Sequence, residues 1–394
     1  MHRVSSPGRR QVILVGAGHA HVGALRRFGL KPLPRAELTL ITRGRHTPYS
    51  GMLPGLIAGH YDAADIQIDT VPLARFAGAR LRQDEVTDID PVKRQVICRD
   101  GPPLHYDLLS INIGSTPNTA DVPGAATGAI PVKPIEGFLP RFGRLLERIL
   151  ARRGAGAVAC VGGGAGGVEL LLSVERRLSR EVKAAGYPAA GLSFVLMTAS
   201  DDILPTFPPA CRARFRAILA TRGIGLVTGA EVTAVEAGQL VLAGHAPITA
   251  DEILWTTQAA PARWLAATGL PLDAHGFIQV NADLRVSGYD DIFAAGDVIS
   301  FASHALPKAG VYAVREGRII ADNIRRMLAG TVPRAFRPQR QALYLISTGD
   351  RYAVGSRNGV TFSGHWVWRW KDWIDRRFMR LFKKLPTRRG LLTN

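Results

Sequence analysis

Two glycine-rich stretches have the spacing of nucleotide-binding loops, and the second is the more complete. Its sequence GGGAGG places Gly162, Gly164 and Gly167 in the full GxGxxG pattern, between an apolar strand-like segment and an apolar helix-like segment. In such a loop the first glycine permits a tight turn, the second lets backbone N–H groups approach a pyrophosphate, and the third lets helix and strand lie close. The pattern therefore predicts a dinucleotide site at residues 162–167.

The first loop, GAGHAH, departs from this pattern at its last position. Gly16 and Gly18 match, but His21 replaces the third small residue. His19 and His21 are two residues apart, so on a helix their side chains point to different sides and do not form a metal-binding pair. We expect a packed or solvent-facing histidine at position 21, and no metal site.

Three further residues could act on a bound cofactor, and each has two interpretations that stay open. Glu169 is either an acid favoured near a helix N-terminus or a carboxylate beside a nicotinamide. Asp297, after the segment IFAAG, either caps a helix or accepts hydrogen bonds from cofactor hydroxyls. Lys308 lies at the start of a predicted helix, 307–328, and is either a surface lysine or a cation that stabilises a reduced flavin.

The cysteines exclude several classes of redox and metal site. Cys98, Cys160 and Cys211 lie far apart, with no CxxC pair, which argues against a disulfide scaffold, a zinc site and a dithiol redox centre. Any electron transfer therefore needs a bound cofactor.

The elements around the loops indicate an α/β fold. Each loop is followed by a second candidate strand, at 36–43 and 192–199, as a strand–helix–strand unit requires. The segment 79–101 alternates like antiparallel strands, and 122–138 is rich in Pro, Gly and Ala and resembles a linker. These boundaries predict four segments: 1–125 and 271–330 as two parts of one domain, 126–270 as a second domain, and 331–394 as a C-terminal domain.

Length and composition fit a globular protein of two or three domains, with 394 residues, 46% hydrophobic and 21% charged. The basic N-terminal segment is followed by a glycine-interrupted strand and not by the apolar stretch of a signal peptide, so we expect a cytoplasmic protein. No apolar stretch approaches the ~20 residues that span a bilayer. Membrane contact, if present, would be peripheral, on the inner face.

The formal net charge of +18 is concentrated in the tail, where residues 331–394 hold fourteen Lys and Arg against three Asp. The segment 365–385 has an amphipathic helical pattern, with Arg and Lys opposite an apolar stripe. The stripe comprises Trp366, Trp370, Trp373, Ile374, Phe378, Leu381, Phe382 and Leu385. Such a helix either lies in a membrane interface or packs on the protein body or a second subunit. Nucleic-acid binding ranks last, because no nucleic-acid-binding fold accompanies the charge.

The order of the motifs resembles a known family. GxG at 16–18, GSTP at 114–117, GGGAGGVE at 162–169 and IFAAGD at 292–297 resemble the two-dinucleotide-binding-domain flavoproteins, and within them the type II NADH dehydrogenase branch of the pyridine nucleotide-disulfide oxidoreductases. More narrowly, GHAHVGALRRFG, HTPYSGMLPGLIAGHY, PKAGVYAVREG and YLISTGDRYAVGSRNG resemble the flavoprotein domain fused ahead of selenide, water dikinase.

The resemblance implies two Rossmann-like dinucleotide-binding domains of three-layer ββα type. The NAD(P)-binding domain would be inserted in the FAD-binding domain, and a small C-terminal domain would follow. FAD would contact Gly16, Gly18, His19, Ala20, Thr42, Arg43, Pro48, Ser50, Gly51, Met52, Leu53, Val86, Gly114, Ser115, Thr116, Gly296, Asp297, Lys308 and Ala309. NADH or NADPH would lie on Gly162, Gly164 and Gly167, with Glu169 near the nicotinamide, and Glu169 and Lys308 would be the catalytic residues.

The chain departs from the family pattern at several positions. Thr42, followed by Arg43, stands where an acid usually binds the FAD ribose, and Thr198 stands at the comparable place in the second unit, which leaves NADH versus NADPH open. Ala309 and Gly310 stand where the dehydrogenases carry the Ala-Gln of the quinone site.

The sequence thus predicts an FAD-dependent NAD(P)H oxidoreductase without redox-active cysteines. Hydride would pass from nicotinamide to flavin, and electrons would then pass to a quinone or another small acceptor. Two alternatives stay open: a flavin reductase linked to selenium metabolism, and a non-enzymatic FAD-binding protein that interacts through its basic tail. The oligomeric state also stays open.

Overall fold

The first glycine loop belongs to a five-stranded parallel sheet. The computed structural model describes residues 8–257, 259–303, 306–339 and 343–386. The strand order of the first sheet is β21-β9-β1-β2-β5, and its strands are β1 (Arg10–Val15), β2 (Ala36–Thr42), β5 (Ala79–Gln83), β9 (Leu108–Ile111) and β21 (Ile292–Ala294). The last four residues of β1, VILV, are all buried, as expected for a parallel strand covered on both faces.

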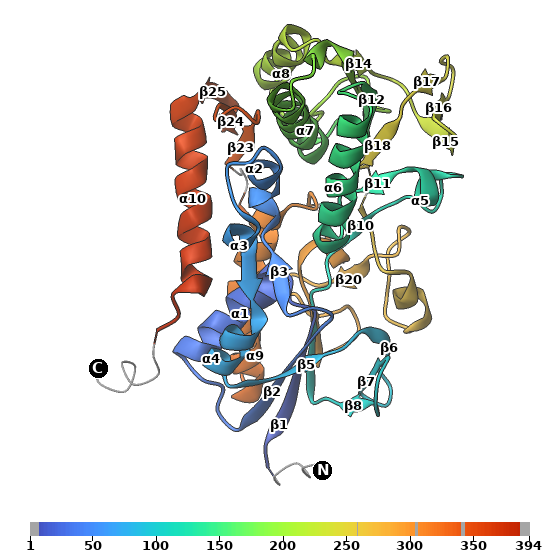
Figure 1. Ribbon diagram of the computed structural model, residues 1–394. Coiled ribbons are helices and arrows are strands. Elements are labelled where there is room, and N and C mark those ends of the chain that lie inside the picture. The colour runs from blue at the N-terminus through green and yellow to red at the C-terminus, as the bar shows by residue number, and fades with distance from the viewer. Residues whose placement is uncertain (1–7, 258, 304–305, 340–342, 387–394) are drawn as a thin grey trace.

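The first sheet is the middle of three layers (Figure 1). The helices α1 (His19–Leu30), α4 (Thr70–Ala77) and α9 (Gly310–Leu328) pack together on one side. A small antiparallel sheet of β6 (Val86–Asp90), β7 (Gln95–Cys98) and β8 (Leu104–His105) lies on the other. The first sheet has the three-layer ββα arrangement that the resemblance implied.

The second glycine loop belongs to another parallel sheet, with the order β11-β18-β12-β13-β14. Its strands are β11 (Ile130–Pro131), β12 (Gly156–Val161), β13 (Leu192–Met197), β14 (Gly225–Val227) and β18 (Glu252–Trp255). The elements around it are α6 (Ile135–Ala151), α7 (Ala165–Ala184), α8 (Pro209–Thr221), β15 (Val232–Glu236), β16 (Gln239–Leu242) and β17 (Ile248–Thr249). All of these follow β9 and precede β21, which are neighbours in the first sheet, so the second unit is inserted in the first. The predicted fold class is therefore confirmed.

Short elements connect the two units and shape the ends of the sheets. The chain crosses between the units at β10 (Thr116–Pro117) and β19 (Ala259–Ala260), which pair with each other antiparallel. The remaining elements of the first unit are β3 (His46–Pro48), α2 (Leu53–Ile57), α3 (Ala63–Ile66), β4 (Gln67–Asp69), β20 (Ile278–Val280) and β22 (Ile299–Phe301).

The C-terminal part is a three-stranded antiparallel sheet followed by one long helix. The sheet contains β23 (Tyr344–Ser347), β24 (Ala353–Arg357) and β25 (Val360–Gly364), and the helix is α10 (His365–Lys383). Figure 1 shows α10 in red along one side of the molecule, with its sheet near α2 and α7. The C-terminal part therefore contacts both nucleotide-binding units.

Three details differ from the sequence-based expectations. The helix predicted from 307 begins at Gly310, because the backbone of Ala309 is extended and Ala309 is the N-cap. The predicted linker 122–138 instead contains α5 (Ala125–Gly128), β11 and the start of α6, because Ala125 and Ala129 are buried in an apolar cluster with β15. The segment 79–83 joins the parallel sheet as β5 and not an antiparallel one.

Candidate functional site

Asn112, directly after β9, holds the first glycine loop in place. Its side-chain carbonyl accepts hydrogen bonds from the backbone N–H groups of Ala20 and His21, at 3.1 and 3.2 Å. Its amide nitrogen donates to the carbonyl of Ala295 at 2.6 Å, which ties the loop to the end of β21. A Cβ at Gly18 would lie 2.3 Å from the Asn112 side-chain oxygen, so the loop can approach β9 only without a side chain there.

His21 fills the position of the missing third glycine as a buried structural residue. Its Nδ1–H donates to the carbonyl of Gly16 at 2.6 Å, and its Nε2 accepts from the Ser110 hydroxyl at 2.8 Å. Burial lowers the pKa of the ring to about 4, so it is neutral at pH 7. The packed histidine expected from the sequence is present, and it ties the loop to β9.

The second loop shows why its third position is a glycine. A Cβ at Gly167 would lie 1.9 Å from the carbonyl oxygen of Gly162 and 2.6 Å from the Thr256 hydroxyl oxygen. Gly162 has a φ of +124°, and Gly164 is the N-cap of α7 without a side-chain cap. Helix N-terminal N–H groups without a side-chain partner suit a pyrophosphate. The second loop therefore fits a dinucleotide pyrophosphate. His21 and Gly167 occupy the equivalent positions of the two loops, and each allows helix and strand to pack closely.

Asp297 lies in a 3-10 turn, Gly296–Val298, at the end of β21. The N-cap of that turn is Ala295, so the interpretation of Asp297 as a helix N-cap is wrong. Its carboxylate pairs with Lys133, a residue of the second unit, with 2.7 Å between Nζ and Oδ2. The Gly296 amide donates to the buried carboxylate of Glu316 at 2.6 Å. Burial raises the pKa of Glu316 to about 7.

Lys308 is a half-buried residue beside this turn, not a surface lysine. Its ammonium donates to the carbonyl of Ile299 and lies 3.8 Å from the centre of the Phe277 ring. Burial lowers its pKa. Lys308, Ala309, Asp297 and Glu316 line a cavity of about 350 Å³. Lys308 thus lies next to Asp297 and Ala309, which are also predicted cofactor residues. Its ammonium group points toward the carbonyl of Ile299.

The segment 48–53 meets the start of α1 and of α9 at one place. Pro48 ends β3, Ser50–Met52 forms a 3-10 turn, and Leu53 begins α2. A Cβ at Gly310 would lie 3.3 Å from His19 Nδ1 and 3.8 Å from the Ser50 hydroxyl oxygen. The structure therefore brings His19, the segment 48–53 and the start of α9 together, although they come from three separate parts of the sequence.

Helix α10 covers the segment 48–53 and contributes to it one buried and one largely buried charged residue. Lys371 donates to the carbonyl of Gly51 at 2.7 Å and to Asp375 at 2.8 Å, and the Tyr49 hydroxyl donates to Asp375 at 3.2 Å. Phe378 packs against the Tyr49 ring, with 4.5 Å between ring centroids. Burial raises the pKa of Asp375. Burial disfavours the charge of Lys371, but Asp375 and Glu169 outweigh it and raise its pKa.

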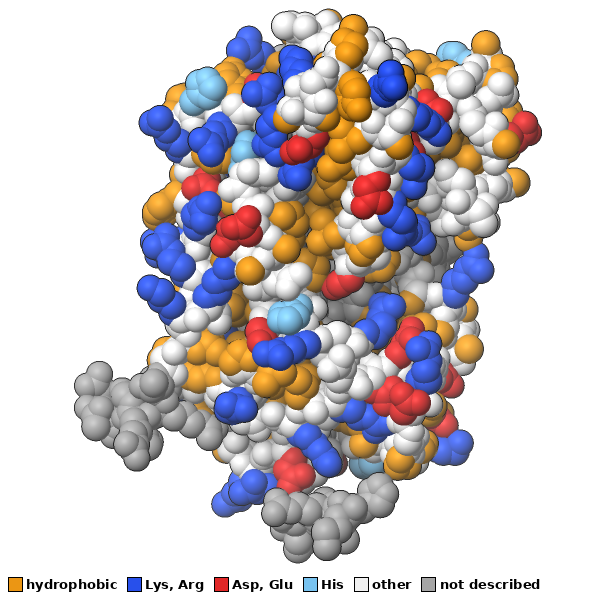
Figure 2. Space-filling view, in the orientation of Figure 1, with side chains coloured by type: hydrophobic (Ala, Val, Ile, Leu, Met, Phe, Trp, Pro, Cys, Tyr) orange, Lys and Arg blue, Asp and Glu red, His pale blue; other side chains and the backbone are white. Residues whose placement is uncertain are grey.

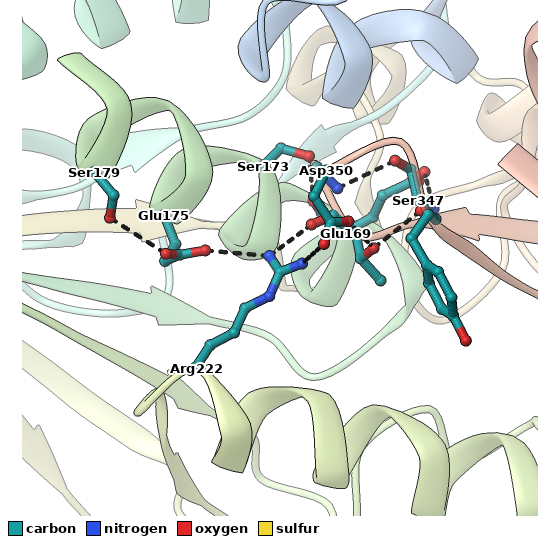
Figure 3. A network of polar contacts seen from close by, with 10 residues as sticks. Glu169, Ser173, Glu175, Ser179, Arg222, Ser347 and Asp350 are labelled. Carbon is teal, nitrogen blue, oxygen red and sulfur yellow. Dashed lines mark hydrogen bonds and ion pairs between the residues drawn. The ribbon is translucent and has the colours of Figure 1, made fainter. Parts of the chain in front are cut away.

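Glu169 faces the C-terminal sheet and not the start of its own helix. It is the fifth residue of α7, so the interpretation as an acid in the first helical turn is wrong. Its Oε1 accepts from the Ser347 backbone N–H at 2.8 Å, as Figure 3 shows. Burial raises its pKa to about 7, although Lys371 and the Ser347 N–H lower it. A carboxyl group with such a pKa gains and loses a proton near neutral pH.

Arg222 fastens the C-terminal sheet to the second unit close to Glu169. Its guanidinium donates to Glu175 of α7 at 3.2 Å, to the carbonyl of Thr348 at 2.7 Å and to Asp350 at 2.6 Å (Figure 3). The β23–β24 turn is therefore held against α7, and Ser347 stays within reach of Glu169.

The predicted adenine end of the first site carries no acid at the end of β2. Thr42 is half-buried, and exposed Arg43 lies 3.8 Å from Glu85, the residue before buried Val86. In the second unit Thr198 is 7% exposed, and its hydroxyl accepts from the Ser200 N–H at 3.3 Å, so this side chain is already engaged. Gly114, with a φ of +73°, and Ser115 lead into β10, which begins at Thr116.

The apolar stripe of the tail is divided between two surfaces. Phe378 and Phe382 pack on the protein body, whereas Trp366 is 56% exposed, Trp373 50% and Leu381 39%. Trp366 and Trp370 stack on each other with 6.5 Å between ring centroids, and Arg377 lies over the Trp373 ring. Figure 2 shows Lys and Arg side chains along the side of the molecule where α10 lies. Packing on the body is confirmed for one part of the stripe, and the tryptophans form an exposed basic-aromatic face.

The three cysteines are buried free thiols, which are poorly suited to redox chemistry. Burial raises the pKa of Cys98, of Cys160 to about 12 and of Cys211 to about 11. Thiols of this kind are poor nucleophiles, because the thiolate is the reactive form.

Sequence reasoning missed five residues of the site: Asn112, Lys133, Glu316, Lys371 and Asp375. Asn112 carried a usable signal, since it ends a buried strand just before Gly114, where parallel strands present side chains to a ligand. The other four carried none that pointed to the site, because Lys133 meets Asp297 and Lys371 meets Gly51 only through the tertiary fold, and Glu316 and Asp375 lie within helices.

The chain matches known proteins over most of its length. Residues 10–317 match the family described as pyridine nucleotide-disulphide oxidoreductase. The NADH dehydrogenase-like protein YutJ of Bacillus subtilis is 27% identical over 296 residues, which cover 74% of this chain and 77% of that protein. The demethylphylloquinone reductase NdbB of Synechocystis is 26% identical over 344 residues, covering 83% of this chain and 81% of that protein.

Two solved structures share the fold. The sulfide:quinone oxidoreductase of Aquifex aeolicus has a TM-score of 0.79 at 19% identity, covering 95% of this chain and 92% of that one. NDH2 of Plasmodium falciparum, in complex with NADH, has a TM-score of 0.78 at 16% identity, covering 96% and 99%. At these identities the likeness is one of fold.

Proposed function

The chain belongs to the pyridine nucleotide-disulphide oxidoreductase family, and from this premise we propose that it is a membrane-associated NAD(P)H:quinone reductase. It is an FAD-dependent NAD(P)H oxidoreductase, as the sequence predicted, and the non-enzymatic alternative is set aside. The proposal adds the acceptor, the residues of each site and the membrane contact.

The observation that carries the proposal is the pair of glycine cradles in two parallel sheets, one inserted in the other. In the proposed assignment, FAD lies along the first loop, Gly114–Thr116, Gly296–Asp297, Lys308–Ala309 and the segment 48–53. NAD(P)H lies on Gly162, Gly164 and Gly167. The segments 1–125 and 271–330, 126–270 and 331–394 remain our proposed domains.

A bound flavin supplies the chemistry of accepting a hydride and releasing two electrons. The chain's own groups do the rest. Loop N–H groups would hold the pyrophosphates, and Phe378, packed on the Tyr49 ring, covers part of the segment 48–53. Glu169, whose pKa is about 7, holds a proton at its carboxyl group near Lys371, whose ammonium donates to the carbonyl of Gly51. This proton is available when an acceptor takes up electrons.

The acceptor meets the flavin directly in this proposal, because the cysteines are buried and unpaired. The two relatives described above are named for NADH dehydrogenation and demethylphylloquinone reduction. These names favour a quinone over a selenium compound. The Ala-Gln of the dehydrogenase quinone site is replaced by Ala309–Gly310, so the quinone contacts of this chain must involve other residues.

A quinone acceptor is consistent with the exposed face of α10. We propose that Trp366, Trp373 and Leu381, with neighbouring Arg and Lys, lie in the interface of an anionic membrane. Within the described residues, no helix is both long enough and apolar enough to pass through a bilayer.

Anaerobic mixing of the FAD-loaded protein with NADH or NADPH tests the proposal. We expect the flavin absorbance near ~450 nm to bleach with at least one nucleotide and to return on addition of a soluble quinone. Parallel additions of selenium compounds test the alternative acceptor. A protein that cannot take up FAD, or whose flavin stays oxidised with both nucleotides, would contradict the proposed function.

A further inference from the structure

Lys133 and Asp297 form an ion pair between the two nucleotide-binding units. The lysine follows β11, the edge strand of the second sheet, and the aspartate lies in the turn after β21 of the first. The 2.7 Å pair is partly shielded, with side chains 35% and 14% exposed. Within residues 8–257, 259–303 and 306–339, it is the one ion pair that joins the two units.

The backbone around Lys133 is held on both sides. The N–H of Val132 donates to the carbonyl of buried Trp255 at 3.1 Å. Pro134 is the N-cap of α6, whose first residue, Ile135, is buried. The ammonium is thus presented from a sheet edge and a helix start, and its position follows the position of the whole second unit.

The ion pair lies near His19, one of the residues predicted to contact the flavin. His19 lies beside it: burial lowers the pKa of His19, Asp297 raises it in part, and Lys133 lowers it further. His19 also contacts the start of α9 and Tyr49 of the segment 48–53. The charges of Lys133 and Asp297 therefore both act on His19, a residue of the proposed flavin site.

We propose that Lys133 is a positioning residue for hydride transfer, which fixes the NAD(P)H-binding unit against the FAD-binding unit by holding Asp297. The inference rests on the proposed function, which places one cofactor on each unit. Hydride transfer needs reacting atoms within ~3–3.5 Å, and a misplacement of ~1 Å can slow a reaction ~100-fold. With the lysine 35% exposed, the pair adds about 0–1 kcal/mol to folding stability, so we expect its loss to alter the alignment of the two units more than the folded fraction.

Stopped-flow reduction of the FAD-loaded Lys133→Met variant by NADH or NADPH, whichever reduces the wild type, tests this role. We expect flavin reduction to slow at least ~10-fold, with reoxidation by quinone, the FAD dissociation constant and the melting temperature unchanged. Lys133→Arg should restore most of the rate. In an Asp297→Asn background, Lys133→Met should have no further effect, because the lysine acts through Asp297.

Hydrogen exchange provides a readout that does not depend on activity. In Lys133→Met we expect faster exchange of the backbone amides at 132–138 and 296–299 and unchanged exchange elsewhere. Lys93→Met is the matched control, since Lys93 pairs with Asp90 at 3.0 Å in the distant β6–β7 turn, and it should change neither exchange at these segments nor reduction. If Lys133→Met does not fold, Lys133→Gln replaces it in every assay.

The outcomes separate the two claims. If neither nucleotide reduces the wild-type flavin, the proposed function fails. If the wild type is reduced and Lys133→Met matches it, only the inference fails. A weaker FAD affinity in Lys133→Met would also overturn the inference, because Lys133 would then act on FAD binding, directly or through Asp297, and not on the alignment of the two units.

Discussion

The side-chain carbonyl of Asn112 lies 3.1 Å from the backbone nitrogen of Ala20, so a residue at the end of β9 caps the helix of the first glycine loop. The same side chain accepts from the His21 N–H and donates to Ala295. One asparagine thus joins three segments around the proposed flavin site.

Asn112→Ala should therefore destabilise the protein and weaken FAD binding. It leaves two helix N–H groups and one buried carbonyl without a partner, at a cost of about 1–3 kcal/mol each before relaxation. Urea unfolding of the apoprotein and FAD titration measure the two effects. Asn118→Ala, at a largely exposed Asn–Asp contact, is the control. If Asn112→Ala matched the wild type in stability and in FAD affinity, the hydrogen bonds of Asn112 would contribute to neither.

The stability should fall as the pH is lowered from about 6.5 to about 4, in part because of His21. Its folded pKa of about 4 is below the unfolded value, so the unfolded chain binds more protons in this window. The contribution is present above pH 6.5 and reaches at most about 3 kcal/mol of loss near pH 4. Urea unfolding between pH 4 and 8 should show a shallower slope for His21→Gln than for wild type. Identical slopes would mean that this ring does not stay neutral when folded.

Glu169→Gln should remove a titration near pH 7 from the pH profile of turnover. In the wild type the carboxyl group exchanges its proton near its pKa of about 7, whereas the amide cannot. The measurement is kcat from pH 5.5 to 8.5 with a soluble quinone. Glu175→Gln, on the same helix but paired with Arg222, should keep the wild-type profile. An unaltered profile in Glu169→Gln would assign the titration elsewhere, with Glu316 as the next carboxyl to replace.

Trp366→Ala combined with Trp373→Ala should lower binding to anionic liposomes at least ~10-fold, because each exposed ring loses burial in the interface. Turnover with soluble acceptors should be unchanged. Val92→Ala, at an exposed apolar residue on the β6–β7 turn, is the control. Sedimentation with anionic and with neutral vesicles measures the effect. Undiminished sedimentation of the double variant with anionic vesicles would remove the membrane role of this face.

The sequence by itself determined the two glycine loops, the strand–helix–strand units around them and the class of chemistry. These features are local, because the glycine spacing and the apolar periodicity that predict them each involve only neighbouring residues. It also identified the amphipathic tail, since helical spacing is local as well.

Only the tertiary structure decided which charged residues serve the site. Lys133 meets Asp297, and Lys371 meets Gly51, across 164 and 320 residues of sequence. It likewise divided the tail into packed phenylalanines and exposed tryptophans, and it turned Glu169 toward Ser347 and the C-terminal sheet. The physical reason is that an ion pair or a buried face depends on which surfaces come together in the folded protein. Local residue spacing along the chain does not reveal those contacts.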